Sequence, residues 1–249
     1  MEDNKTSSYR KIVKGTALFG GVQVFNILVS LIRGKLIAII LGPEGMGISS
    51  LLTSSTNMLQ QFSSLGLNYS AVKDISYAKE NGDQERLSLV IHVLRRLLHL
   101  TSLIGSLISI LFAEQLSLLA FGTTDYKWSF VGLSIMIYFT TLSNGELAIL
   151  QGVRMLKQLA YSSIIGSLLG LMVGVPLYYY YGYDGIVPAM IVLSLMTYLF
   201  NRYYANKVQH YHLKANWDVT KTIGRTMLAL GMILLVSGLL TTISNYLLN

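Results

Sequence analysis

The sequence predicts an all-α fold, a polytopic membrane helix bundle with about seven transmembrane helices. Hydrophobic residues make up 52% of the chain and charged residues only 12%, about half the charged share of a soluble domain. So few charges cannot cover a soluble surface, and lipid must therefore solvate much of the exterior. Long apolar runs alternate with connections, and Lys and Arg gather in every second connection. Both patterns are typical of membrane-spanning helices.

The apolar runs define the expected spans. They cover residues 16–41, 46–68, 97–119, 128–149, 162–181, 185–204 and 226–247. Runs of this length favour helices over the shorter, alternating strands of a membrane barrel. We expect a six-helix lobe over residues 1–206, a connecting elbow over 207–225 and the start of a second lobe over 226–249. No small-residue cleavage site closes the first run, so we interpret it as an anchor and not as a removed signal peptide.

The first expected span carries charge inside an apolar run, SLIRGKLIAIIL. Its polar side chains fall within about 100° of one another on a helical wheel; they are Thr16, Gln23, Asn26, Ser30 and Arg33. A charge at mid-bilayer depth costs about 2.5 to 3.5 kcal/mol, so Arg33 needs a polar environment. We interpret it as a cation that lines a water-filled cavity, where its planar fork suits a phosphate group. Snorkelling or a structural ion pair is the alternative.

Lys35 lies about 200° around the same wheel from Arg33. It can extend its ammonium to the outer interface or pair with an acid on a neighbouring helix, and Glu114 is a candidate partner for either cation. The connection that follows, GPEG at residues 42–45, predicts a tight turn with proline at its second position.

The second expected span, residues 46–68, is polar along one face. Ser50, Ser54, Asn57, Gln61, Ser64 and Asn68 recur at spacings of three and four residues. Such a helix can cross a bilayer when its polar face meets protein or water. We therefore expect Asn57, Gln61 and Ser64 to line the substrate cavity together with the polar stripe of the first span. The alternative is an amphipathic helix on the membrane surface. If residues 46–68 did not cross the membrane, however, every later connection would move to the opposite side.

Glu146 lies near the inner end of the fourth expected span and is a candidate for coupling transport to protons or sodium ions. The alternative is an acid that water simply solvates at the cytoplasmic end of the helix. Five tyrosines between residues 178 and 183 suit an aromatic belt at the outer boundary.

The sequence lacks the residues that several classes of function require. The chain has no cysteine and its histidines show no metal-ligand pattern, so we expect no metal site. No glycine-rich loop follows a predicted strand, and we expect no cofactor and no catalytic residue. The net charge of +7 is divided between apolar blocks and forms no continuous basic stripe, which argues against nucleic acid as a partner.

The basic residues also predict the orientation in the membrane. Sixteen of the 19 Lys and Arg residues lie at the N-terminus or in connections that share its side. The opposite connections, LGPEG, FGTTDYK and YGYDG, contribute only Lys127. The positive-inside rule therefore predicts a cytoplasmic N-terminus.

The stretch GKLIAIILGPEGMGISSLL and the later LNYSAVKDISYAKENGDQERL resemble the start of lipid-linked oligosaccharide flippases. These proteins belong to the multidrug/oligosaccharidyl-lipid/polysaccharide exporter superfamily, and the likeness is greatest to O-antigen translocases and lipid III flippases. Further similar stretches are AFGTTDYKW, LQGVRMLKQLAYSSIIGSLLG, YGYDGIVPAMIV and KANWDVTKTIGRTMLAL. The resemblance runs along nearly the whole chain.

This resemblance implies two pseudo-symmetric bundles around a central cavity, of which the chain would supply the N-terminal lobe and one further span, as a truncated product or a fragment. It implies that an undecaprenyl-pyrophosphate-linked oligosaccharide, such as an O-antigen unit, is flipped across the bacterial inner membrane by alternating access. The expected partners are the lipid bilayer, this glycan and other membrane proteins of glycan assembly. The family places basic residues in this part of the first helix, and either Arg33 or Lys35 fits that role.

Three other classes stay open at this point. A drug or cation antiporter of the same superfamily would carry acids deep in the first span, where this chain has bases. A membrane polymerase or ligase of glycan assembly would expose a large outer loop. A non-transporting membrane fragment is the third class.

The predicted orientation can be tested with single cysteines, since the chain has none of its own. Replacement of Glu44, Asp125 or Asp184 by cysteine should give labelling by a membrane-impermeant thiol reagent added outside intact cells. Cysteines in place of Asp83, Lys157 or Lys214 should react only after lysis. Labelling at position 83 but not at position 44 in intact cells would reverse the topology.

Overall fold

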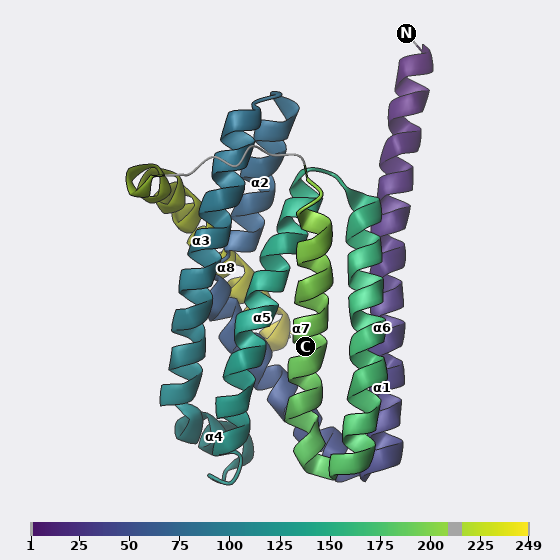
Figure 1. Ribbon diagram of the computed structural model, residues 1–249, viewed down its shortest axis with the longest axis vertical. Helices are drawn as coiled ribbons and strands as arrows, with labels where there is room; N and C mark the ends of the chain where they lie inside the picture. Colours follow the sequence, from purple (N-terminus) through teal and green to yellow (C-terminus); the bar gives the residue numbers. More distant parts are fainter. Residues whose placement is uncertain (1, 209–215, 249) are drawn as a thin grey trace.

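The computed structural model describes residues 2–208 and 216–248, with side chains for residues 20–208 and 216–237. Every regular element in this part of the chain is helical, as predicted (Figure 1). The elements are α1 (Glu2–Ser64), α2 (Leu67–Glu80), α3 (Gln84–Leu111), α4 (Ala113–Phe121), α5 (Lys127–Gly152), α6 (Leu156–Tyr181), the 3-10 turn η1 (Gly182–Gly185), α7 (Ile186–Ala205) and α8 (Trp217–Leu248).

The helices pass up and down between two ends of a bundle. Five segments in the described residues are long and apolar enough to cross a membrane. Two of these segments reverse direction internally, at Gly42 and at η1, so they account for seven passes. The N-terminus, the α2–α3 turn, the α5–α6 turn and the end of α7 lie at one end of the bundle (Figure 1). These are the Lys- and Arg-rich connections, and the polytopic all-α prediction is confirmed.

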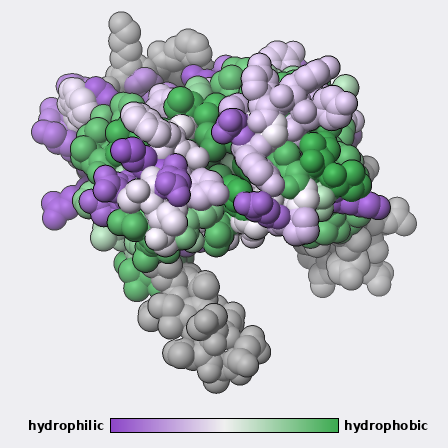
Figure 2. Space-filling view, turned by 90° about the horizontal axis from the view of Figure 1, so that it is seen from below, coloured by the Kyte–Doolittle hydropathy of each residue, from purple (hydrophilic) through white to green (hydrophobic). Residues whose placement is uncertain are grey.

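The opposite end of the bundle carries the break in α1, α4 and η1. Figure 2 views this end and shows hydrophilic side chains interspersed among hydrophobic ones. Tyr179, Tyr180 and Tyr181 at the end of α6 are 65% exposed or more. Amphipathic rings at this level are typical of a membrane–water boundary.

The first two predicted spans are the two arms of α1, and the turn predicted over residues 42–45 is a break at a single residue. Gly42 has φ 72° and ψ −174°, and Pro43 begins the second arm. Proline is favoured at the first position of a helix because its missing N–H would have no partner there. The second arm therefore starts three residues earlier than the hydropathy pattern indicates.

The connection expected between residues 68 and 97 is helical, which corrects the predicted boundaries. Leu67, Ala71, Ile75 and Ala78 of α2 are fully buried and recur at spacings of three and four, so they form one apolar face against α3 and α5. Asp83 caps α3 by accepting a hydrogen bond from the backbone N–H of Arg86. A window average misses this helical hairpin because its charged outer face lowers the mean hydropathy.

α8 runs obliquely behind α3 and α5 (Figure 1) and packs across the α1–α2 junction. There Leu65 and Gly66 adopt left-handed conformations, with φ 46° and 67°. A Cβ atom at Gly66 would lie 2.1 Å from the carbonyl oxygen of Gly231 in α8. The two backbones touch directly, so residue 66 must lack a side chain.

Gly66→Ala should therefore destabilise the bundle more than Gly82→Ala. Both glycines have a positive φ, 67° and 68°, but nothing lies within 4 Å of a Cβ atom at Gly82. Each substitution costs about 1 to 2 kcal/mol for the left-handed backbone, and only Gly66→Ala must also displace α8. We expect a clearly lower apparent melting temperature in detergent for Gly66→Ala. Equal losses for the two variants would contradict this contact.

Candidate functional site

A polar cavity of about 300 Å³ lies between the first arm of α1 and helices α5, α6 and α7. Its polar lining consists of Asn26, Ser30, Arg33, Thr140, Ser143, Asn144, Ser163, Ser167, Ser194, Thr197 and Asn201. Apolar side chains such as Val29, Met136 and Leu193 complete the walls. Its volume is at the lower end of the range for small-molecule sites.

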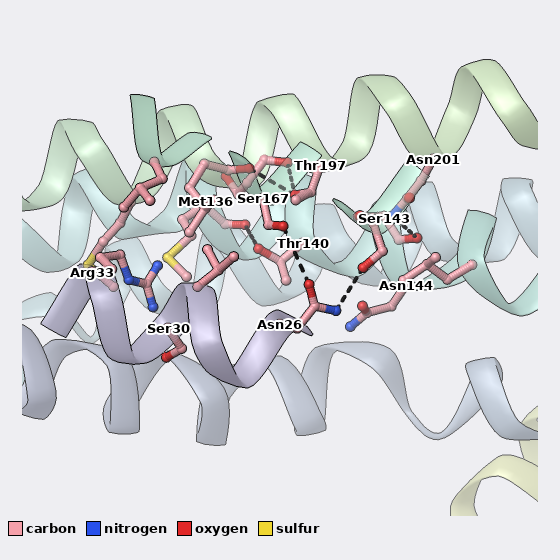
Figure 3. Close-up of a pocket in the computed structure, with 17 residues that line it drawn as sticks. Asn26, Ser30, Arg33, Met136, Thr140, Ser143, Asn144, Ser167, Thr197 and Asn201 are labelled. Carbon is pink, nitrogen blue, oxygen red and sulfur yellow. Dashed lines mark hydrogen bonds between the residues drawn. The ribbon is translucent and has the colours of Figure 1, made fainter. Parts of the chain in front are cut away.

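Asn26 joins α1 to α6 in the middle of the cavity (Figure 3). Its Nδ2 donates to Ser163 Oγ at 2.9 Å, and Ser167 Oγ donates to its Oδ1 at 3.4 Å. These bonds satisfy an amide at membrane depth, where an unpaired polar group is costly. They also fix the rotation of α1 so that Ser30 and Arg33, one and two turns further along, face the same cavity.

Arg33 lies at one end of the cavity, and its guanidinium points into it beside Met136 (Figure 3). No carboxylate lies within 4.0 Å of this guanidinium in the described part of the chain. The predicted alternative of a structural ion pair, with Glu114 as partner, is therefore not what the structure shows. Arg33 gives the cavity a positive charge that is free to meet an anion.

Asn201 lies at the other end of the cavity (Figure 3). Its Nδ2 donates to Ser143 Oγ at 2.7 Å, which joins α7 to α5. Its Oδ1 is buried and has no hydrogen-bond partner among the described residues. The cavity thus has a buried amide hydrogen bond between α5 and α7 at one end and a cation at the other.

Glu146 is buried just beyond that second end, with 3% of its surface exposed. Arg95 of α3 donates to both of its carboxylate oxygens, at 3.0 and 2.8 Å, and Arg202 of α7 also donates to Oε1. Arg95 donates further to Asn206 Oδ1 at 3.0 Å. The expectation of a water-solvated acid at this position is wrong, because three helices close around the carboxylate.

The predicted site residues do not form one group. Asn26, Ser30 and Arg33 line the cavity, whereas Gln23 and Lys35 are exposed and lie outside its lining. On the second arm of α1, Asn57 and Gln61 are exposed, and Ser64 donates to the Gln61 carbonyl oxygen at 3.1 Å. Thr56 and Ser63 are the polar residues that this arm buries.

The contributions of α5, α6 and α7 were missed by the sequence analysis. They are mostly Ser and Thr, together with Asn144 and Asn201. Ser and Thr inside an apolar helix usually bond to their own backbone carbonyls, so such residues give little signal one at a time. Asn144 and Asn201, two amides inside apolar runs, were the usable signal.

No cluster of three or more His, Asp or Glu residues capable of holding a metal occurs in the described residues. What the lining provides is hydroxyl groups, amides and one guanidinium.

Comparisons with known proteins agree with this description. The family described as "Polysaccharide biosynthesis protein" matches residues 12–248. The lipid III flippases of Escherichia coli (strain K12) and Shigella flexneri are each 26% identical over 213 residues. These matches cover 83% of this chain and 50% of each relative, so the chain spans about half the length of the curated relatives. No solved structure matches.

The helical bundle and its apolar spans define a multi-pass membrane protein. The chain belongs to the polysaccharide biosynthesis protein family, which matches it over nearly its full length.

Replacement of Glu146 by glutamine should destabilise the bundle, because it leaves Arg95 and Arg202 without their counter-charge. Removal of one partner from a buried ion pair costs about 3 to 5 kcal/mol, and partial exposure of Arg202 favours the lower value. Glu80→Gln is the control: its pair with Arg154 is exposed and contributes less than about 1 kcal/mol. Apparent unfolding midpoints in detergent should fall for Glu146→Gln only. Equal midpoints would show that the cluster adds no stability.

Proposed function

We propose that this chain takes part in flipping an undecaprenyl-pyrophosphate-linked oligosaccharide, such as an O-antigen unit, across the bacterial inner membrane. The observation that carries the proposal is the unpaired Arg33 in a hydroxyl- and amide-lined cavity. The relatives named lipid III flippase support the same substrate class. The N-terminus would face the cytoplasm, and other glycan-assembly membrane proteins would be partners.

The chemistry of the cavity suits the two parts of such a head group. A guanidinium donates two parallel hydrogen bonds to a phosphate, and Arg33 is the only cation in the cavity lining. Sugar hydroxyls both donate and accept, and the Ser, Thr and Asn side chains of α5 to α7 do the same. The polyprenyl tail would stay in lipid.

We propose that residues 1–206 act as the N-terminal lobe of a two-lobe transporter, with an elbow over 207–225 and a second lobe from 226. Alternating access would then rock this lobe against the other around the substrate. Exposed polar residues of α1 such as Gln23, Lys35, Asn57 and Gln61 would border the central cavity between the lobes. Polar side chains at membrane depth call for such protein or water contact.

Glu146 remains the candidate for ion coupling, but its ion pairs restrict how it could act. Two arginines from α3 and α7 already neutralise it. A role in coupling requires these pairs to open during the transport cycle, which would loosen α3 and α7 from α5. Binding of substrate phosphate by one of the released arginines would compensate for this opening.

Arg33→Ala should abolish nearly all transport, and Arg33→Lys should leave part of it, because lysine keeps the charge but loses the fork. One charge-assisted hydrogen bond contributes about 1.5 to 3 kcal/mol, so the alanine variant should bind substrate roughly 10- to 150-fold more weakly. The measurement is restoration of surface glycan in a flippase-null strain at matched membrane abundance.

Lys35→Ala is the matched control, since Lys35 is exposed outside the cavity. It should cost much less activity than Arg33→Ala. If Lys35→Ala abolishes assembly while Arg33→Ala retains it, the substrate phosphate binds on the exposed face of α1 and not in the cavity.

A further inference from the structure

A second hollow lies far from the Arg33 cavity, between α3 and the first turns of α8. It has a volume of about 620 Å³. Its lining is apolar at Leu97 of α3 and at Leu228 and Ala229 of α8, and Gly224 lets α8 pack closely against Leu97. Trp217, Lys221 and Arg225 form its rim. The groove therefore combines an apolar channel with a cationic, aromatic edge.

The rim lies where the surface of α3 changes from polar to apolar. Before residue 95 the exposed side chains include Glu85, Arg86 and His92. After residue 97 they are hydrophobic: Leu100, Leu103, Ile104, Leu107, Ile108 and Leu111 are all more than 40% exposed. A change of this kind marks the level of the lipid head groups. The channel thus opens at head-group level and its apolar walls continue towards the acyl chains.

The basic residues of the rim have no acidic partner. No carboxylate lies within 4.0 Å of the Arg96, Lys221 or Arg225 side-chain nitrogens in the described residues. Lys221 and Arg225 are exposed and lie one helical turn apart on α8. The acid nearest to them along α8 is Asp218, one turn before Lys221 and outside ion-pair distance. The two neighbouring cations repel one another, and a bound anion relieves that repulsion.

Arg96 holds the rim in place. Its guanidinium stacks on the Trp217 ring, 3.5 Å from the ring centroid, and Nη1 donates to Thr220 Oγ1 at 3.4 Å. Both contacts join α3 to the first turn of α8. Trp217 is still 51% exposed, so its indole borders the channel and can touch whatever occupies it.

We propose that this groove binds an anionic phospholipid, with the phosphate at Lys221 and Arg225 and one acyl chain along Leu97, Leu228 and Ala229. Charge complementarity selects the head group, and the apolar channel selects a lipid over a free phosphate. The bound lipid would anchor the start of α8 against α3. This site is separate from the Arg33 cavity and does not depend on the proposed transport function.

Trp217 provides the readout, because the chain has two tryptophans and Trp128 lies at the opposite end of the bundle. The full chain with Trp128→Phe is placed in detergent micelles and titrated with acyl-brominated phosphatidylglycerol or phosphatidylcholine. Bromine quenches indole emission only on contact. We expect the anionic lipid to quench Trp217 at a much lower mole fraction than the zwitterionic lipid.

Lys221→Gln with Arg225→Gln should remove this preference. Each basic residue near a membrane surface contributes about 1 kcal/mol towards an anionic lipid, so the double variant should bind phosphatidylglycerol roughly 25-fold more weakly at low salt. Lys73→Gln with Lys79→Gln is the matched control, since it removes the same charge from the exposed side of α2 and should keep the preference.

Ala229→Phe tests the channel independently, without changing any charge or any buried residue. It should weaken quenching because the phenyl ring fills the acyl site. This variant tests the proposal even if the double variant fails to fold. Equal quenching by both lipids, an equal loss in the control, or displacement of the lipid by inorganic phosphate at matched ionic strength would each overturn the proposal.

Discussion

Polar side chains at membrane depth have no water to bond, and this constraint decides which face of each helix in this protein turns inward. Glu146 shows it most clearly: a carboxylate on α5 is enclosed by Arg95 of α3 and Arg202 of α7. An isolated charge could not be buried there. Three helices are therefore brought to one point towards the end of the bundle where α7 ends. The Asn201–Ser143 and Asn26–Ser163 bonds extend the same requirement along α7 and α1.

The cavity follows from those bonds. Because Asn26 is held against α6, the polar stripe of α1 points between α5, α6 and α7 rather than into lipid. The hydroxyl groups on these three helices then line a space whose one free cation, within the described lining, is Arg33. Glu146 and Arg33 are thus both charged residues inside the bundle, but only Glu146 has its counter-charges there.

α2 and the first turns of α3 and α8 have a more polar outer surface than the rest of the bundle. Water reaches their outer faces, so charged residues such as Arg86 and Lys79 are exposed and only one face must be apolar. The close contact of Gly66 with Gly231 lets α8 cross the α1–α2 junction without intervening side chains. Arg96 then binds the start of α8 to α3 by stacking on Trp217. These contacts place a cationic rim at the level where lipid head groups lie.

The sequence by itself determined the helical class, the number of passes and the shared side of the basic connections, since hydropathy and charge act residue by residue. It also placed Arg33 apart from Lys35, because angular position on one helix depends only on spacing. It could not place the helices relative to each other. The contact of Glu146 with Arg95 and Arg202 depends on which helix faces pack together. The position of Asn57 and Gln61 outside the cavity that contains Asn26 depends on how α1 bends at Gly42. Only the tertiary structure decided this. Arg95 and Glu146 are 51 residues apart in the chain, and Asn26 and Ser163 are 137 residues apart. Partners so distant in sequence leave no local pattern.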